Sequence, residues 1–166
     1  ESLSPLEFTR LRPGVYCGDT STSTQLVVEI VSNAVDEFRL GHGNLITVEI
    51  LGARVTVSDH GQGFIPNSFR EDGKTILEAA FSVLNTSGKY REDGTYEGTS
   101  LGSFGIGSKL ATYLSHELIV TTYRDGQGER ITFNEGVFAD RDSTEVDKNI
   151  HGTSVFWRAS EEFFTD

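Results

Sequence analysis

Residues 24–63, TQLVVEIVSNAVDEFRLGHGNLITVEILGARVTVSDHGQG, contain the pattern from which the fold is predicted. The first part of this stretch carries apolar residues at three- and four-residue steps, which indicates a helix with one buried face that ends before Gly41. These apolar residues are Val27, Val31, Ala34, Val35 and Phe38. Residues 45–51 and 54–58 then alternate apolar with polar side chains across a two-residue link. That alternation predicts an antiparallel hairpin with one buried face.

The pattern continues outward from this stretch in both directions. Residues 1–24 are rich in Pro, Gly, Ser and Thr and predict an irregular arm. Two further helices are expected, one over about 75–84 and one from about Ile106, separated by a long polar connection at 85–105. The end of the chain predicts strands over 117–123, 130–133 and 153–157, with a turn at 125–128 and a polar excursion through Lys148. We expect one domain over residues 1–166.

Composition limits the classes of partner. The chain has 166 residues and a mass of 18.2 kDa, enough to bury a core without disulfides. Its net charge is −11, from 14 basic and 25 acidic residues. Binding of DNA, RNA or an anionic membrane needs clustered Lys and Arg, so this domain is not expected to bind them by itself.

Cysteine and hydropathy indicate the compartment. Cys17 is the only cysteine, which excludes a disulfide scaffold and a cysteine-rich zinc site and favours a reducing cytoplasm. No apolar run approaches the roughly 20 residues of a membrane helix, and no signal peptide is present, so no membrane partner is expected. The chain contains no methionine, so we expect it to be an excised piece or a processed product.

Four polar residues are stacked along one side of the first predicted helix. They are Glu29, Asn33, Asp36 and Glu37, at spacings of four, seven and eight residues. One interpretation is a solvated helix face. The other is a metal and water site, since the amide oxygen of Asn33 suits Mg²⁺ and Glu29 could accept a proton from an attacking water.

A second candidate is Asp59, at the end of a predicted strand and followed by Gly61 and Gly63. A carboxylate there can accept a hydrogen bond from an exocyclic amine, while the bare glycine backbone lets a flat ring approach. An ordinary Asp-Gly turn is the alternative.

A third candidate is the glycine-rich segment 102–109, GSFGIGSK, which leads into a predicted helix. Free backbone N–H groups, a helix N-terminus and a nearby lysine can cradle a phosphate, and a flexible hinge is the alternative. The spacing matches neither a Walker P-loop nor a dinucleotide fingerprint.

These candidates occur in an order that resembles the gyrase, Hsp-type chaperone, histidine kinase and MutL (GHKL) superfamily of ATP-binding domains, known as the Bergerat fold. Within it the likeness is strongest to the ATPase domains of type II DNA topoisomerases, the gyrase B and topoisomerase IV ParE subunits. The likeness rests on RPGVYCGD at 12–19, EIVSNAVDE at 29–37, VSDHGQG at 57–63, GKY at 88–90, the glycine loop at 102–107 and GTSVFW at 152–157.

The resemblance implies a fold and a set of roles. The fold is an α+β two-layer sandwich, with a mixed, mainly antiparallel sheet and helices on one face. Glu29 would be the general base, Asn33 the Mg²⁺ ligand and Asp59 the acceptor of the adenine amino group, with Thr153 supporting that contact. The other nucleotide-binding positions implied are Asp36, Gly61, Gly63, Ile65, Lys89, Gly102, Gly105, Ile106, Gly107 and Lys109. Those at the pocket mouth, where ATP-competitive inhibitors pack, are Glu37, Pro66 and Arg124.

The chain also departs from the family pattern. Gln62 stands where gyrase B usually has an arginine paired with a glutamate like Glu37, and Ser103-Phe104 replaces a leucine-histidine pair. Lys109 is either an extra phosphate ligand or a solvated helix residue. The four histidines show no metal-ligand spacing.

The implied function is Mg²⁺-dependent ATP binding and hydrolysis that drives DNA strand passage. The implied partners are DNA through other domains, a second copy of the chain and a cleavage subunit of the gyrase A or ParC type. We expect the isolated domain to be a monomer with slow or absent turnover. A MutL-like or chaperone ATPase, and a module of the same fold that no longer binds nucleotide, are the alternatives.

Overall fold

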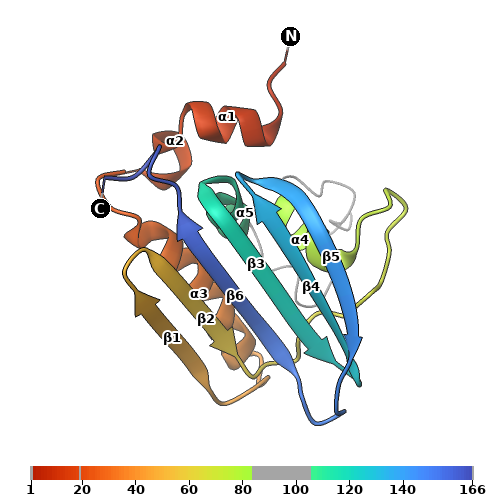
Figure 1. Cartoon of the computed structure of the whole chain (residues 1–166). Helices are drawn as coiled ribbons and strands as arrows, with labels where there is room; N and C mark the ends of the chain where they lie inside the picture. The colour runs from red at the N-terminus through yellow and green to blue at the C-terminus, as the bar shows by residue number, and fades with distance from the viewer. Residues whose placement is uncertain (1, 19, 84–105, 166) are drawn as a thin grey trace, which may run out of the picture.

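The computed structural model describes residues 2–18, 20–83 and 106–165, with five helices and six strands in those ranges (Figure 1). The helices are α1 (Pro5–Leu11), α2 (Gly14–Cys17), α3 (Thr24–Arg39), α4 (Ile76–Ser82) and α5 (Ile106–Tyr113). The strands are β1 (Ile46–Leu51), β2 (Arg54–Asp59), β3 (Ser115–Arg124), β4 (Gln127–Asn134), β5 (Val137–Glu145) and β6 (Gly152–Ala159).

The strands form one sheet in the order β1-β2-β6-β3-β4-β5. Every neighbouring pair among these strands is antiparallel. The last strand, β6, is inserted at the centre between the hairpin β1–β2 and the meander β3–β4–β5, so it joins the two halves of the sheet. The expected two-layer arrangement with a mainly antiparallel sheet is confirmed.

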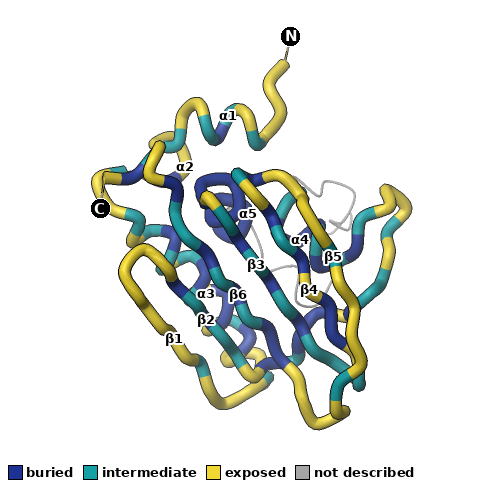
Figure 2. Tube along the Cα trace, in the orientation of Figure 1, coloured by how far each residue is buried: buried dark blue, intermediate teal, exposed yellow. Residues whose placement is uncertain are grey.

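The core lies between the sheet and the helices α3, α4 and α5, which cover one of its faces (Figures 1 and 2). Alternate residues of the central strands point into this layer, as the period of two in a strand requires. The largest buried side chains include Trp157, Phe81 and Phe133. Capping fixes where α4 begins, because the Thr75 hydroxyl accepts a hydrogen bond from the Glu78 backbone N–H at 3.1 Å.

Two expectations about secondary structure were wrong. The arm at 1–24 contains α1 and α2 instead of irregular chain, and α1 starts with a capping box between Ser4 and Glu7. The polar excursion before Lys148 contains the edge strand β5, which pairs with β4 along its length. The turn between them has positive φ at Glu135 and Gly136, a hairpin geometry that Asn-Gly or Asp-Gly usually signals.

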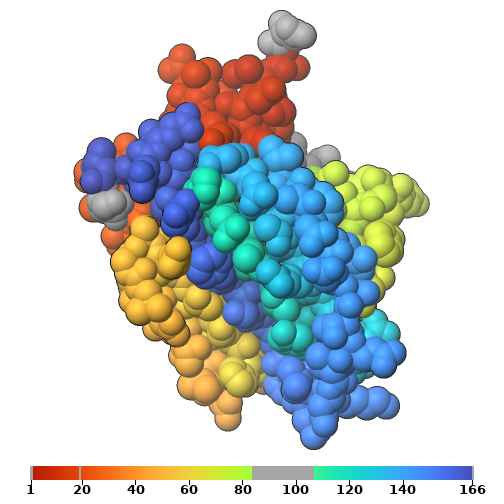
Figure 3. Space-filling view, in the orientation of Figure 1, coloured from red at the N-terminus to blue at the C-terminus, as the bar shows by residue number. Residues whose placement is uncertain are grey.

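The helices α1 and α2 lie at one end of the molecule (Figure 3). Arg10 fastens α1 there, because its guanidinium donates to the Tyr113 carbonyl at 2.8 Å and to the Glu135 carboxylate at 2.8 Å. The same group stacks on the ring of Phe163. No helix in the described ranges is long and apolar enough to cross a membrane.

The rotation of α3 also differs from the expectation. Its bounds agree with the predicted helix, but Val35 and Phe38, which were assigned to the buried face, are 40% and 39% exposed. The buried side chains of α3 are Leu26, Ile30, Asn33, Ala34 and Glu37. Two of the polar residues predicted for a site therefore face the interior.

Candidate functional site

Asp59 is the last residue of β2, and it pairs with Thr153 near the start of β6. Its carboxylate Oδ1 accepts a hydrogen bond from the Gly61 backbone N–H at 2.8 Å, which closes a short turn. Burial raises the pKa of this carboxyl, the Gly61 hydrogen bond lowers it, and the nearby charge of Glu37 raises it again. The net direction is upward, so the acceptor that the sequence predicted is a desolvated carboxyl group.

A hydroxyl pair extends the site across the sheet. The Thr153 Oγ1 lies 3.1 Å from the Thr122 Oγ1 of β3, and Thr122 also accepts a hydrogen bond from the Phe64 backbone N–H at 2.8 Å. Both threonines are buried. The loop after β2 is thus fastened to β3 by the Thr122 hydroxyl, which also contacts β6.

A small cavity lies where α3, β2, α4 and β6 meet. It has a volume of about 10 Å³ and is lined by Asn33, Asp59, Phe81 and Thr153 together with aliphatic residues. That space is close to what one water molecule requires. The structure therefore brings the predicted Asn33, Asp59 and Thr153 to one place, although they are far apart in the sequence.

The buried polar residues of α3 have atoms without partners. Asn33 Nδ2 and Glu37 Oε1 form no hydrogen bond within the described part of the chain, and the same holds for Gln62 Oε1 on the adjacent turn. The other Glu37 oxygen, Oε2, lies 3.2 Å from His42 Nδ1. Buried polar atoms without partners cost free energy, so a cluster of them beside Asp59 indicates a place where a ligand or water supplies the missing partners.

Glu29 and Gly107 are in close contact. A Cβ atom placed on Gly107 would lie 2.9 Å from the Glu29 Cβ and would overlap its carboxylate Oε2. The Glu29 Oε1 accepts a hydrogen bond from the Gln25 side chain at 2.8 Å. The side chain of the predicted base therefore lies against the backbone of the first turn of α5.

Other predicted positions surround this centre. Gly63 has φ +77° and is packed so closely on the Tyr123 carbonyl that a side chain would not fit. Pro66 is buried, whereas Ile65 is exposed. Arg124 ends β3, and its Nε lies 3.7 Å from the Asp125 carboxylate.

The remaining predicted site residues are buried, half-buried or outside the described residues. Lys109 is only 4% exposed, so the interpretation as a solvated helix residue was wrong. Asp36 is half-buried on α3. Lys89, Gly102 and Gly105 lie outside the described residues, and of Ile106 only its place at the start of α5 is described.

Sequence reasoning did not find the histidines at this end of the sheet. His151 Nδ1 lies 2.6 Å from the Gly61 carbonyl oxygen, and His42 contacts Glu37 as described above. The His60 backbone N–H donates to the Leu45 carbonyl at 3.2 Å. The pairing of β2 with β6 brings His151 beside Gly61, whereas His42 reaches Glu37 from the segment that follows α3.

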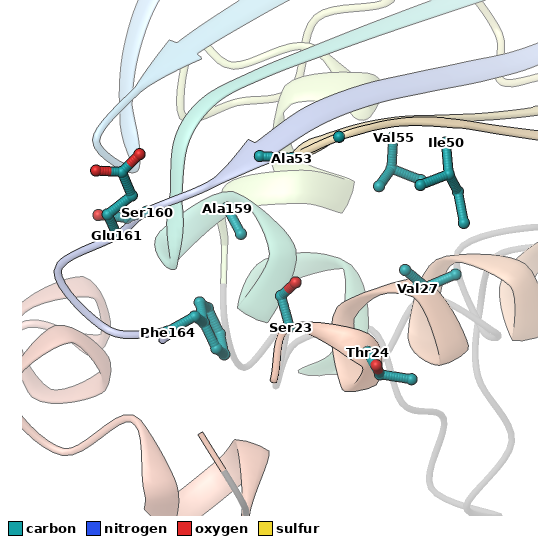
Figure 4. A pocket seen from close by; sticks show the side chains of 11 residues that line it. Ser23, Thr24, Val27, Ile50, Ala53, Val55, Ala159, Ser160, Glu161 and Phe164 are labelled. Carbon is teal, nitrogen blue, oxygen red and sulfur yellow. The ribbon is translucent and has the colours of Figure 1, made fainter. Parts of the chain in front are cut away.

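A larger cavity of about 240 Å³ lies at the other end of α3 (Figure 4). Its lining comes from the start of α3, the β1–β2 hairpin and the end of β6, and includes Ser23, Val27, Ile50 and Phe164. Among the described residues, none of the predicted site positions lines it. The site described above is therefore separate from this larger cavity.

The sequence matches a known protein family and is similar to several curated proteins. Residues 21–155 match the family model described as histidine kinase-, DNA gyrase B-, and HSP90-like ATPase. The chain is 35% identical to the type 2 topoisomerase B subunit of Aquifex aeolicus over 99% of its own length, and 35% identical to the DNA gyrase B subunit of Borreliella burgdorferi over 98%. It is 39% identical to the DNA topoisomerase 4 B subunit of Staphylococcus aureus over 81%.

The fold is also similar to a solved structure. The 43K ATPase domain of Thermus thermophilus gyrase B, crystallised with an aminocoumarin, superposes with a TM-score of 0.80 and 28% identity. The match covers 97% of this chain and 40% of that one. The chain spans 21%, 26% and 20% of the three curated relatives named above.

Proposed function

The chain belongs to the histidine kinase-, DNA gyrase B- and HSP90-like ATPases, and we propose that it is the ATP-binding domain from the B subunit of a type II DNA topoisomerase. The observation that carries this proposal is the convergence of Asn33, Asp59 and Thr153 from three separate elements on one cavity. The curated relatives support the assignment to topoisomerases rather than to MutL-like or chaperone ATPases.

Recognition of adenine begins at Asp59. Its carboxylate accepts the exocyclic amino group, while the Thr153 hydroxyl and a water in the adjoining cavity bond the ring edge. The backbone N–H group of Gly61 already donates to this carboxylate. An ionised carboxylate has about four acceptor sites, so it can also accept from a base that carries N–H donors.

Hydrolysis uses Glu29 as the general base that takes the proton of the attacking water. A bound Mg²⁺ ion would neutralise part of the negative charge of the phosphates. The donor set fits this ion, since the buried Asn33 side chain carries an amide oxygen, a hard ligand of the kind that Mg²⁺ prefers. Asn33 lies one helical turn after Glu29 on α3, so base and ligand lie on the same side of the helix.

The phosphates would lie against the first turn of α5. Gly107 has no side chain to obstruct them, and the helix N-terminus favours negative charge. Gly102, Gly105, Ile106 and Lys89 complete this part of the proposal, with Lys109 as a further phosphate ligand. Gly61, Gly63, Ile65 and Asp36 would line the nucleotide, while Glu37, Pro66 and Arg124 would meet inhibitors of the aminocoumarin kind at the mouth.

The activity of the whole protein is part of the proposal. ATP binding would bring two copies of the chain together and drive passage of DNA, which other domains and a cleavage subunit of the gyrase A or ParC type would hold. The acidic charge of this domain agrees with DNA being bound elsewhere. The single cysteine is buried, which agrees with a reducing, cytoplasmic location.

Calorimetric titration of a non-hydrolysable ATP analogue with Mg²⁺ tests this proposal. We expect the wild-type chain to bind and Asp59→Asn to lose binding, because an amide cannot replace the carboxylate as a charged acceptor. Asp140→Asn, an exposed position on β5, is the matched control and should bind as the wild type does. Binding that survives in Asp59→Asn would contradict the assignment of adenine to this residue.

A further inference from the structure

The turn that follows β2 is held from two sides. On one side the Gly61 backbone N–H donates to Asp59 Oδ1 at 2.8 Å. On the other side the carbonyl oxygen of the same residue lies 2.6 Å from His151 Nδ1. Gly61 is therefore fixed through both of its backbone polar groups, and the group that fixes its carbonyl comes from a segment ninety residues later.

The chemistry of this contact determines which ring nitrogen carries the proton. A carbonyl oxygen can only accept a hydrogen bond, so Nδ1 of His151 must be the donor. The neutral ring is then held as the Nδ1–H tautomer, and the protonated ring donates from the same atom. The contact is consistent with both charge states and does not depend on titration of the histidine.

We propose that His151 is a positioning residue for nucleotide binding, which fixes Gly61 through its carbonyl so that the Gly61 N–H orients the Asp59 carboxylate toward adenine. This inference rests on the proposed function of Asp59. The chain of contacts runs from His151 to Gly61 and then to Asp59, so His151 would act on the adenine contact through Gly61. His151 directly precedes β6, whose Thr153 pairs with Asp59, so the same segment fixes two sides of the adenine contact.

Surrounding contacts leave the turn few other anchors. Gly61 packs against the Glu37 side chain so closely that a Cβ on Gly61 would lie 3.3 Å from its Oε2 and 2.8 Å from Asp59 Oδ1. An ionised carboxylate only accepts hydrogen bonds, so an ionised Glu37 side chain cannot donate to the Gly61 carbonyl. The histidine is the donor that the described structure gives to that carbonyl.

The test combines nucleotide affinity with a spectroscopic signature in three variants. His151→Ala removes the donor, and His151→Asn keeps an N–H donor on the atom next to Cγ, where Nδ1 stands in histidine. His116→Ala is the matched control, because His116 Nδ1 also bonds an oxygen, that of Glu135, at the other end of the sheet. Affinity for the ATP analogue is measured by calorimetry, and the His151 tautomer and the Gly61 amide proton are followed by NMR in the wild-type chain.

His151 is exposed, so water competes for its hydrogen bond and the loss is expected to be modest. We expect His151→Ala to weaken nucleotide affinity about fivefold, with His151→Asn within about twofold of the wild type. His151→Ala should also speed exchange of the Gly61 amide proton and raise the pKa of Asp59, because the Gly61 hydrogen bond lowers that pKa. The control His116→Ala should change none of these quantities.

Two results would overturn the inference: an Nε2–H tautomer at His151, or wild-type affinity and an unchanged Gly61 amide in His151→Ala. Failure of the wild-type chain to bind nucleotide would instead refute the proposed function. The tautomer and the Gly61 exchange rate decide the positioning of the turn without any nucleotide, so the two failures are distinguishable.

Discussion

Replacement of Gly107 by alanine tests the proposed catalytic geometry most directly. The added Cβ would lie 2.9 Å from the Glu29 Cβ and would overlap the carboxylate. The carboxylate can rotate away, but the Glu29 Cβ is fixed to α3, so α3 and α5 must also separate by several tenths of an ångström. Glu29 therefore loses the position that the glycine leaves free for it.

The structure sets the size of two opposing effects of Gly107→Ala. Crowding in a packed layer costs about 1–3 kcal/mol, and alanine in a helix returns about 0.5–1 kcal/mol relative to glycine. The net loss of stability should be about 0–2.5 kcal/mol, so the variant should fold. Misplacement of a catalytic group by about 1 Å can lower the rate about 100-fold, and we expect a loss of that order in kcat.

The assay is phosphate release at saturating ATP and Mg²⁺ by the full-length protein, with the melting temperature recorded in parallel. Gly14→Ala is the control, because it adds the same methyl group where no atom lies within 4 Å. It should leave kcat unchanged and should not lower the melting temperature, since Gly14 lies in α2. A folded Gly107→Ala protein that hydrolyses ATP at the wild-type rate would refute the placement of the base against α5.

Two further predictions concern stability. Glu129 is fully buried and accepts hydrogen bonds from Thr75 at 2.6 Å and Arg141 at 3.1 Å. Glu129→Ala should therefore cost about 3 kcal/mol of stability and lower Tm by about 6–12 °C in a thermal melt. Glu49→Ala, at an exposed position, is the control and should leave Tm unchanged. Equal melting temperatures for these two variants would contradict that reasoning. Burial raises the pKa of Asp59, so the protonated carboxyl contributes stability to the folded protein below the usual pKa of 3.8. This contribution is lost as the pH rises through the raised pKa. Asp59→Asn should therefore melt above the wild type at neutral pH, and its advantage should shrink toward pH 3.8; a constant difference across this range would disprove the charge argument.

Local signals explain which parts of the fold could be predicted. The hairpin β1–β2 has alternating strands on a two-residue link, and both features are encoded within one short stretch, residues 46–59. The strand β5 was missed because its turn, Glu135-Gly136, lacks the usual Asn or Asp, and because both of its faces are largely exposed. A strand with no buried face has no alternation to detect.

The chemistry of the candidate site was predictable only where a single segment carries it. Asp59 and its glycines lie in one turn and were found from the sequence. Thr122, His42 and His151 were not found, because they reach the site through pairing of β6 with β2 and β3 and through the end of α3. Such long-range pairings leave no local trace in the sequence.

The rotation of α3 shows how a wrong expectation can itself locate a site. Apolar periodicity predicted that Val35 and Phe38 face the core, yet Asn33 and Glu37, at 8% and 6% exposure, occupy that position. Burial of polar groups opposes folding unless partners are supplied, and each of these side chains keeps an atom without a partner in the described structure. Asp59 and Thr153 line the same cavity as Asn33, so these polar groups are gathered at one place. A helix that turns amide and carboxylate groups inward while leaving apolar side chains exposed breaks the local rule, and it does so at the point where we propose that the nucleotide binds.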